Sequence, residues 1–207
     1  MSALNSTFLY RMTHIDNVLH IIKYGVTHIS SINANKNYVP IGDNSIISTR
    51  NEFKLSNNKK LGEYIPFYFG TRMPMLYVIQ KGFNSVTTIK PENIVYCVTS
   101  VQNIIDAGLK FLFTNGHAID SFTEYFDESH LNNIDSIIDK KALGSKFWKD
   151  DKDLDFKRRK EAEFLIESDL PASAIVGWVV FNKAAQEKLV QFGISSSIIK
   201  ITPKYYF

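Results

Sequence analysis

The chain has 207 residues, 44% of them hydrophobic, which is enough for one sizeable core and suits a single domain over residues 1–207. Its formal net charge of +3 permits a polyanionic partner without requiring one. A single cysteine, Cys97, excludes an internal disulfide framework and fits a reducing compartment. The chain opens with no basic and apolar leader, and its longest apolar run, AIVGWVVF, is far shorter than the roughly 20 residues of a membrane span. We therefore expect a cytoplasmic protein with no membrane partner.

The N-terminal part predicts a helix, a loop and a short strand. Residues 13–25, THIDNVLHIIKYG, place apolar side chains at helical spacing, with Thr13 as the predicted N-cap and Gly25 as the stop signal. Residues 31–45 are rich in Asn, Ser, Gly and Pro and predict an irregular loop. Residues 46–50, IISTR, predict a strand that ends at Arg50.

The remaining elements alternate irregularly. Residues 62–82 predict extended structure with turns and one short helix, and residues 119–155 predict helix and loop. Strands are predicted at residues 93–100, 110–116, 162–168, 173–181 and 197–207, and helices at residues 101–108 and 182–193. Strands and helices mixed without regular alternation indicate an α+β fold rather than a doubly wound sheet.

Several common chemistries are excluded. The chain has neither the Gly-x-Gly-x-x-Gly fingerprint nor a Gly-x-x-x-x-Gly-Lys phosphate loop. Its five histidines lack close metal-ligand spacing, and one cysteine makes a structural zinc site implausible, so we expect no metal. A Rossmann-type dinucleotide site is excluded, while other ways of binding NAD stay open.

Glu163 is the strongest single-residue clue. It stands between Ala162 and Phe164 in an apolar run, and on a strand its side chain points away from both. If that face meets solvent, Glu163 is an ordinary surface carboxylate. If the face lines a cleft, its desolvated carboxylate is a candidate catalyst. The preceding basic run, residues 157–160, is either a solvated turn or a contact for phosphates.

Other candidates each have an ordinary alternative. Arg50 is either a surface arginine or a fork-shaped donor to a pyrophosphate or ribose. His14 either makes a local hydrogen bond or belongs to a ligand-binding turn at the start of the first helix. The aromatic residues 67–69 fit a core better than a cofactor site.

Five segments in the same order resemble the DarT family of DNA ADP-ribosyltransferase toxins. They run from Tyr10 to Ile166, about three quarters of the chain, and read YRMTHIDNVLHIIKYGV, VPIGDNSIISTR, IPFYFGTRMPMLY, FLFTNGHA and RRKEAEFLI. The resemblance implies an ADP-ribosyltransferase fold, with a split, mostly antiparallel sheet and surrounding helices. It implies cleavage of NAD and transfer of ADP-ribose to a base, typically thymine, of single-stranded DNA, an activity of the glycosyltransferase and nucleotidyltransferase classes. The implied partner is a DarG-like macrodomain antitoxin that reverses the modification in a toxin–antitoxin system.

The resemblance also assigns residues. Glu163 matches the family's catalytic glutamate, Arg50 its essential arginine, and His117 a histidine close to the active site. Thr13, His14 and Ile15 match the turn that contacts NAD, together with Arg50. Residues 30–40 and 127–150 match least, which leaves the base and sequence preference open.

The implied chemistry accounts for a carboxylate in an apolar run. Cleavage of NAD develops positive charge on a ribose, which Glu163 can stabilise while it fixes a ribose hydroxyl. The resemblance also makes the arginine the group that receives the base proton. A charged arginine is a poor proton acceptor, so we interpret Arg50 as a clamp on NAD and a stabiliser of the deprotonated base, and we leave the route of the proton open. The alternatives are a transferase of the same fold that acts on RNA or protein, and a non-catalytic module that binds nucleic acid.

Overall fold

The structure is a computed structural model that describes residues 3–84 and 86–207. The helices of these residues are α1 (Ala3–Ser6), α2 (Val18–Tyr24), α3 (Asn44–Glu52), α4 (Pro74–Lys81), α5 (Val101–Asp106), α6 (Ile134–Ile137), α7 (Lys140–Gly144), α8 (Phe156–Lys160) and α9 (Lys183–Gln191). The strands are β1 (Phe8–His14), β2 (Ile65–Tyr68), β3 (Ile94–Ser100), β4 (Phe111–Thr114), β5 (Tyr125–Phe126), β6 (Glu163–Ile166), β7 (Gly177–Val180) and β8 (Ile199–Ile201). Short 3-10 helices join several of them, among them η1 (Ile15–Asn17) and η2 (Leu61–Glu63).

The strands form one sheet in the order β5-β4-β6-β2-β1-β3-β7-β8. Every pairing is antiparallel except that of β7 with β8. The two halves of the sheet meet between β2 and β1 through a single register pair, Tyr10 with Tyr68. Beyond that pair the halves diverge, which matches the expected split. The predicted α+β class and the mostly antiparallel sheet are confirmed.

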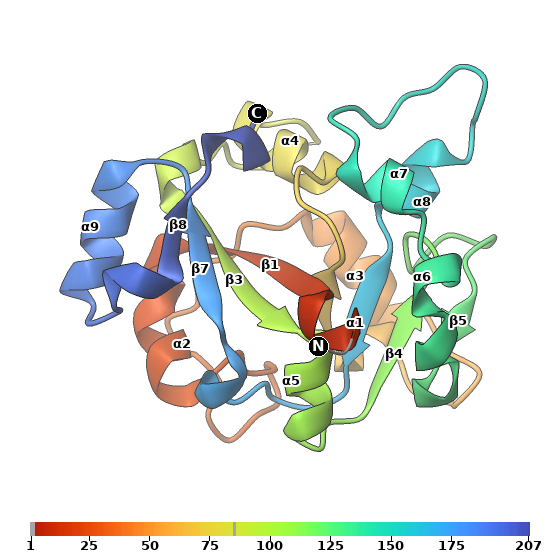
Figure 1. Cartoon of the computed structure of the whole chain (residues 1–207), viewed down its shortest axis with the longest axis horizontal. Coiled ribbons are helices and arrows are strands. Elements are labelled where there is room, and N and C mark those ends of the chain that lie inside the picture. The colour runs from red at the N-terminus through yellow and green to blue at the C-terminus, as the bar shows by residue number, and fades with distance from the viewer. Residues whose placement is uncertain (1–2, 85) are drawn as a thin grey trace.

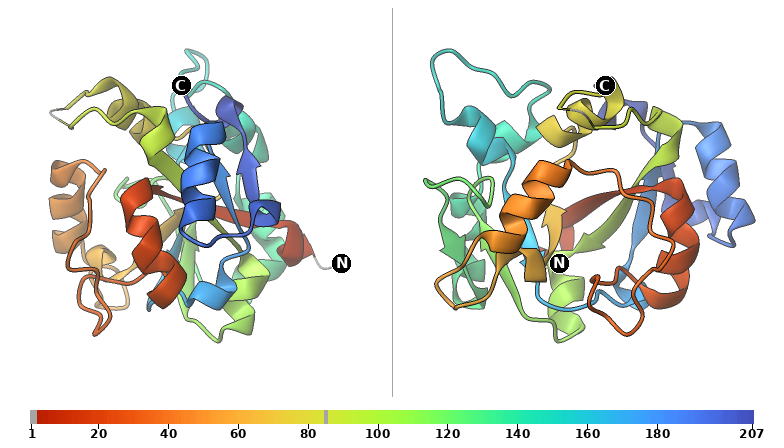
Figure 2. Two further views of the ribbon diagram at one scale, coloured as in Figure 1. Left: turned by 90° about the vertical axis from the view of Figure 1, so that its left-hand side faces the viewer. Right: turned by 180° about the vertical axis from the view of Figure 1, so that it is seen from behind.

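Helices surround this sheet on all sides (Figure 1). Helices α2 and α9 lie near the β7–β8 end, and α6, α7 and α8 lie near the β4–β5 end. Helix α3 lies behind the sheet in Figure 1 and in front of it in the reverse view of Figure 2. The loop that connects α2 to α3 crosses the same side of the sheet (Figure 2).

The main core lies where the middle strands meet the helices. Phe67, Phe113 and Phe164 from three neighbouring strands are wholly buried there, and Cys97 is buried beside them in β3. The core interpretation is therefore confirmed for Phe67, Phe69 and Cys97, whereas Tyr68 lines the cavity described below. Within residues 3–84 and 86–207, no helix combines the length and apolar character that crossing a bilayer requires.

The prediction of a strand at residues 46–50 is wrong, because these residues form most of helix α3. The β-branched run IIST favours a strand by local preference. Asp43 overrides it as an N-cap, since its carboxylate accepts a 2.8 Å hydrogen bond from the backbone N–H of Ser45. The helix places Arg50 in its last turn, facing the sheet.

The predicted N-cap at Thr13 is also wrong. Strand β1 continues through Thr13 to His14, which pairs with Ile94 of β3, so the first helical turn begins only at Ile15. The cap is instead His14, whose ring nitrogen accepts a 3.3 Å hydrogen bond from the backbone N–H of Asp16. The predicted stop at Gly25 is confirmed, with a φ of +80° that favours glycine.

Two further predictions need correction. The final strand covers only Ile199–Ile201 of residues 197–207, because Pro203 begins a 3-10 helix. Residues 119–155 contain the short strand β5 as well as helix and loop, since Phe113 and Phe126 pair across the sheet edge. The basic run, residues 157–160, lies in helix α8 rather than in a turn.

Candidate active site

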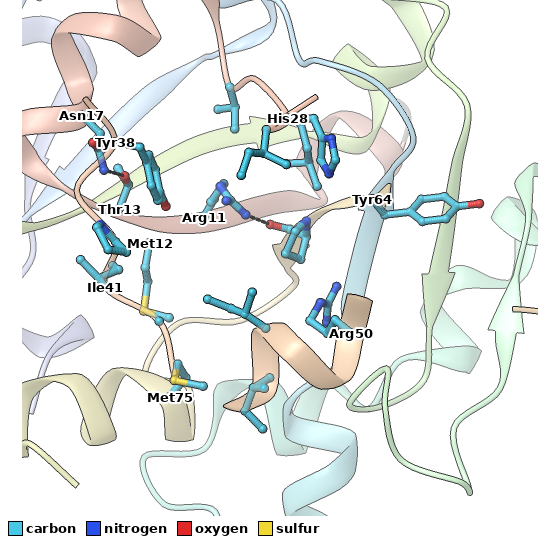
Figure 3. Close-up of a pocket in the computed structure, with 18 of the residues that line it drawn as sticks. Arg11, Met12, Thr13, Asn17, His28, Tyr38, Ile41, Arg50, Tyr64 and Met75 are labelled. Carbon is cyan, nitrogen blue, oxygen red and sulfur yellow. Dashed lines mark hydrogen bonds between the residues drawn. The ribbon is translucent and has the colours of Figure 1, made fainter. Parts of the chain in front are cut away.

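A cavity of about 500 Å³ opens on the side of the sheet that α3 covers. Figure 3 shows one side of it formed by the apolar Met12, Ile41 and Met75, and the opposite side by Arg50 and Tyr64. Its polar lining residues come from several segments of the chain and include Arg11, Thr13, Asn17, His28, Arg50, Tyr64, Tyr68, His117 and Glu161. Its volume lies in the range of roughly 300–1,000 Å³ that is typical of small-molecule sites.

Arg50 and Glu163 meet at the wall of this cavity. Nη1 of Arg50 donates a 2.8 Å hydrogen bond to Oε2 of Glu163. Arg50 lines the cavity, whereas Glu163 has no exposed surface and lies behind it. The open-solvent interpretation of Glu163 is therefore wrong, and the two strongest sequence candidates form one buried ion pair.

Groups in the segment from Thr114 to Ala118 hydrogen-bond both the side chain and the backbone of Glu163. Its Oε1 accepts a 2.9 Å hydrogen bond from the backbone N–H of Ala118. Its own backbone N–H donates to Oγ1 of Thr114 at 2.9 Å, and that hydroxyl donates to the carbonyl of Gly116 at 2.7 Å. The turn that follows β4 thus fixes the orientation of the carboxylate.

Arg50 retains an unused donor. Its Nη2 is buried and has no hydrogen-bond partner among the described residues. Burial by itself lowers the pKa of Arg50, but Glu163, together with Tyr68 and Tyr125, outweighs that effect and raises the pKa. The group is therefore a permanent cation with a free N–H, and a buried donor of this kind calls for an acceptor from a ligand.

His117 and Tyr68 complete the polar wall near this pair. The backbone N–H of His117 donates to the carbonyl of Arg158 at 3.0 Å, which places its ring on the cavity. Burial lowers the pKa of His117, so its imidazole is neutral at neutral pH despite the nearby Glu163. Burial likewise raises the pKa of Tyr68 and keeps its phenol protonated.

The expected NAD-contacting turn is only partly at the cavity. Thr13 lines the cavity, and its Oγ1 accepts a 3.0 Å hydrogen bond from Nδ2 of Asn17 (Figure 3). Ile15 is buried in the main core, and His14 is partly buried, with its ring nitrogen accepting from the backbone N–H of Asp16. The side chains of His14 and Ile15 do not belong to the cavity lining, so their contact with NAD stays a prediction.

Sequence reasoning missed several polar residues of the cavity, among them Arg11, Asn17 and Glu161. Arg11 points across it and donates a 2.8 Å hydrogen bond to the carbonyl of Pro66 (Figure 3). Asn17 bonds the backbone of Val39 twice, through Nδ2 to its carbonyl and through Oδ1 from its N–H, both at 2.8 Å. Glu161 lies two residues before Glu163 and caps the C-terminus of α8, where the chain is not yet extended.

Three side chains of the basic run, residues 158–160, bond to other groups of the protein. Arg158 is paired with Asp155, and Arg159 with the carboxylates of Asp139, Asp153 and Asp155. Lys160 is wholly buried, and its Nζ donates to the carbonyl of Ser145 at 2.7 Å. The interpretation of this run as a solvated turn is wrong for Lys160, which is buried. Arg158 and Arg159 are paired with carboxylates of the protein itself, where the alternative interpretation placed phosphates.

No group of three or more His, Cys, Asp and Glu side chains in the described part of the chain is arranged to hold a metal ion.

Comparison with known proteins identifies the family. The profile of the family described as "ssDNA thymidine ADP-ribosyltransferase, DarT" matches residues 10–207. The chain belongs to the DarT family. The matched residues include Arg50, Glu163 and every residue that lines the cavity.

Two relatives of this DarT-family chain are informative. The DNA ADP-ribosyl transferase of Thermus sp. (strain 2.9) is 31% identical over 89% of this chain and 86% of its own length. The solved structure of Thermus sp. 2.9 DarT with ADP-ribosylated ssDNA has a TM-score of 0.82 and 27% identity, over 97% of this chain and 96% of that chain. The structure of the same protein with NAD+ has a TM-score of 0.77 and 26% identity, over 97% of this chain and 98% of that chain.

The second relative joins two activities in one chain. It is a DNA ADP-ribosyl transferase–DNA ADP-ribosyl glycohydrolase fusion protein of Thermosipho africanus, 34% identical over 69% of this chain. The match covers 35% of the fusion protein, so this chain corresponds to only part of that protein.

Proposed function

We propose that this protein cleaves NAD at its nicotinamide glycosidic bond and transfers ADP-ribose to thymine in single-stranded DNA. The observation that carries the proposal is the buried Arg50–Glu163 pair at the wall of a cavity of about 500 Å³, in a chain of the DarT family. The Thermus relative, solved with NAD+ and with ADP-ribosylated single-stranded DNA, supports both substrates. We assign the activity to one domain over residues 1–207.

Glu163 is the group that stabilises bond cleavage in this proposal. As nicotinamide leaves, positive charge develops on C1″ and on the ring oxygen of the ribose. A carboxylate in a site without water stabilises that charge far more strongly than it would in solution. The Ala118 N–H holds one oxygen of Glu163, and a ribose hydroxyl donates to the other beside Arg50.

Arg50 then acts as the clamp on NAD. Its free Nη2 donates to the pyrophosphate or to a ribose, and its fork can hold two acceptors at once. Thr13, His14 and Ile15 form the turn that contacts NAD, supported by the position of Thr13 on the cavity. His117, neutral and beside Ala118, acts near the reacting centre as a hydrogen-bonding group.

The acceptor is a base outside a duplex. A base edge inside a stacked helix cannot reach a ribose held in a cavity, and extracting the base costs a few kcal/mol. The single-stranded substrate of the relative is consistent with this requirement. The product carries a glycosyl group taken from a nucleotide, which puts the activity in the glycosyltransferase and nucleotidyltransferase classes.

A partner that removes the modification completes the proposal. The Thermosipho relative carries a DNA ADP-ribosyl glycohydrolase in the same chain. We propose that a DarG-like macrodomain antitoxin supplies that activity here, and that this chain carries the toxin activity of the pair. The single buried cysteine suits the reducing cytoplasm, where NAD and DNA are both present.

Parallel labelling reactions test the proposal. The protein is incubated with labelled NAD and with a thymine-containing single strand, the same strand annealed to its complement, the same strand with every thymine replaced by cytosine, RNA, or protein. We expect strong label on the thymine strand alone. Equal label on the duplex contradicts the exposed-base requirement, and label on RNA or protein alone favours those acceptors. An absence of NAD consumption with every acceptor would indicate a non-catalytic module.

A further inference from the structure

Four aromatic rings pack together beside helix α4, outside the cavity. We call this set the aromatic patch, and its members are Tyr77, Phe83, Trp148 and Phe207. The Tyr77 ring is central, with one ring stacked on it at 5.5 Å between centroids and two meeting it edge to face at 5.3 Å each. Met75 and Ile79 line the cavity from α4, and Tyr77, between them in the helix, lies on the opposite face. The patch and the cavity thus share one helix.

The protein covers these rings only in part. Phe83 is 50% exposed, and the other three rings are partly buried. Phe147, next to Trp148 in the loop between α7 and α8, is 64% exposed. This loop projects from the body of the molecule (Figure 1). Large apolar rings that gather at a surface are a feature of interaction sites rather than of a core.

Cations without salt-bridge partners surround the aromatic patch. They are Arg72, Lys81, Lys146, Lys149 and Lys204. No carboxylate in residues 3–84 and 86–207 forms a salt bridge with any of them. Lys81 follows Tyr77 by about one helical turn in α4, and two of the lysines flank the aromatic pair at residues 147–148. The carboxylates next in sequence are Asp150 and Asp151, so the set keeps a positive excess.

Arg72 adopts an unusual backbone conformation beside the patch. Its φ is +54°, in a region that residues other than glycine rarely adopt. Its neighbour Met73 lines the cavity, whereas the guanidinium of Arg72 lies 4.2 Å from the centroid of the Phe207 ring. Nη1 of Arg72 donates a 3.3 Å hydrogen bond to the carbonyl of Lys204, and its Nε is buried without a partner in the described part of the chain. Backbone conformations of this kind cost energy and are frequent where a side chain serves a ligand.

The chemistry of this surface fits a single strand of nucleic acid. Aromatic faces stack on bases, and the lysines and arginines around them neutralise phosphates. The basic run before β6 does not supply the phosphate contacts that were expected of it, because Arg158 and Arg159 are paired with carboxylates of the protein. The acceptor strand that the proposed function brings to the cavity is anionic and carries unstacked bases, and only α4 separates the cavity from the patch.

We propose that the aromatic patch binds nucleotides that flank the target base in the acceptor strand. The target base enters the cavity on one side of α4, the neighbouring bases stack on the rings at the other side, and Arg72, Lys146 and Lys149 contact the phosphates. The inference rests on the proposed function and adds a second contact with the same substrate. This contact favours long strands over short ones whatever the flanking sequence, because every base has a face that can stack.

Binding and labelling with strands of two lengths test the proposal. One strand of about 5 nucleotides contains the target thymine, and one of about 16 nucleotides adds flanking cytosines. We expect the wild-type protein to bind the longer strand at least about tenfold more tightly, and Trp148→Ala to lose most of this advantage. In labelling reactions the loss should appear in the Michaelis constant for the longer strand. Equal affinity of the two proteins for the longer strand overturns the proposal.

Tryptophan fluorescence gives a readout that needs no NAD. The chain has two tryptophans, and Trp178 is only 2% exposed. A base stacked at Trp148 should quench the emission as the longer strand is added. Trp148→Phe should remove this quenching and keep most of the affinity, because phenylalanine still stacks, and it decides the matter if the alanine variant folds poorly. A patch that serves a protein partner instead gives neither quenching nor length dependence, and that result overturns the proposal.

Two matched controls make the result specific. Lys149→Gln should reduce the slope of log affinity against log salt concentration by about 0.7, as expected for one lost phosphate contact with a single strand. Lys110→Gln removes an exposed lysine between α5 and β4, at the opposite end of the molecule from α4 (Figure 1), and should leave the slope unchanged. Phe8→Ala removes an exposed ring opposite Ser100 and should leave the affinity unchanged. Equal effects of Lys110→Gln and Lys149→Gln would show attraction by net charge alone and overturn the assignment.

The possible failures are distinguishable. If the wild-type protein labels both strands with the same Michaelis constant and the Trp148 variants match it, the role of the patch is overturned while the proposed function stands. If the longer strand binds more tightly and quenches Trp148 but neither strand is labelled, the proposed function falls, and the patch remains supported as a surface that binds single strands.

Discussion

Nη1 of Arg50 lies 2.8 Å from Oε2 of Glu163, a contact that joins helix α3 to strand β6 across 113 residues of the chain. Both side chains are buried, so the pair loses most of the hydration that each charge has in water. Such pairs add little net stability, but removing one member leaves the other charge buried and unpaired. We infer that the pair is present for the chemistry of the site.

Replacing Glu163 separates its chemical role from its structural one. Glu163→Gln keeps an oxygen to accept from Arg50 or Ala118, while Glu163→Ala leaves Arg50 unpaired. We expect both variants to lose about 100-fold or more in DNA labelling. The alanine variant should also lose about 3–5 kcal/mol of unfolding free energy, and the glutamine variant less. Labelling assays and thermal unfolding measure the two effects, and wild-type-like labelling by either variant contradicts the catalytic assignment.

Arg50→Lys tests whether the fork of the guanidinium matters. Lysine keeps the positive charge but has a single donor centre, so it cannot hold Glu163 and a ligand acceptor in the same plane. We expect turnover to fall at least about tenfold, with a higher Michaelis constant for NAD. Steady-state kinetics of the folded variant decide this, and equal turnover would indicate that a point charge suffices.

Asn17→Asp tests the attachment of the loop between α2 and α3. The amide of Asn17 donates to and accepts from Val39, and it also donates to Thr13 on the cavity wall. Aspartate loses both donations and places a negative charge against the Val39 carbonyl. We expect faster hydrogen exchange at the Val39 amide and a Michaelis constant for NAD raised severalfold, with a smaller change in turnover number. Asn37→Asp adds the same charge at an exposed position of that loop and should leave both quantities near wild type.

The burial of Glu161 predicts a pH-dependent stability. Its pKa of about 7 in the folded protein exceeds the value of 4.5 expected when unfolded, so the folded state binds more protons between these pH values. The contribution of Glu161 therefore makes the protein less stable as the pH rises through that window. Glu161→Gln should raise the melting temperature by a few degrees at pH 8, with the gain shrinking towards pH 5. A gain that is equal at both pH values would show that Glu161 is not protonated in this range.

Local sequence patterns determined most of the elements and the chemistry-bearing residues. The alternation around Glu163 predicted strand β6, Gly25 marked the end of α2, and the apolar run around Cys97 predicted β3. These signals are local, because side-chain period and backbone preference act over a few residues. The ordered segments from Tyr10 to Ile166 also indicated the family, which the comparison confirms.

Tertiary structure alone decided what those residues do together. Residues 46–50 have the composition of a strand, yet the Asp43 cap and the docking of Arg50 against Glu163 make them a helix. The same packing buried both faces of strand β6, so Glu163 has no exposed surface. The nearby carboxylate of Glu161 lies on the cavity instead. Burial, hydrogen-bond partners and pKa depend on residues up to a hundred or more positions away, and no local pattern contains those contacts.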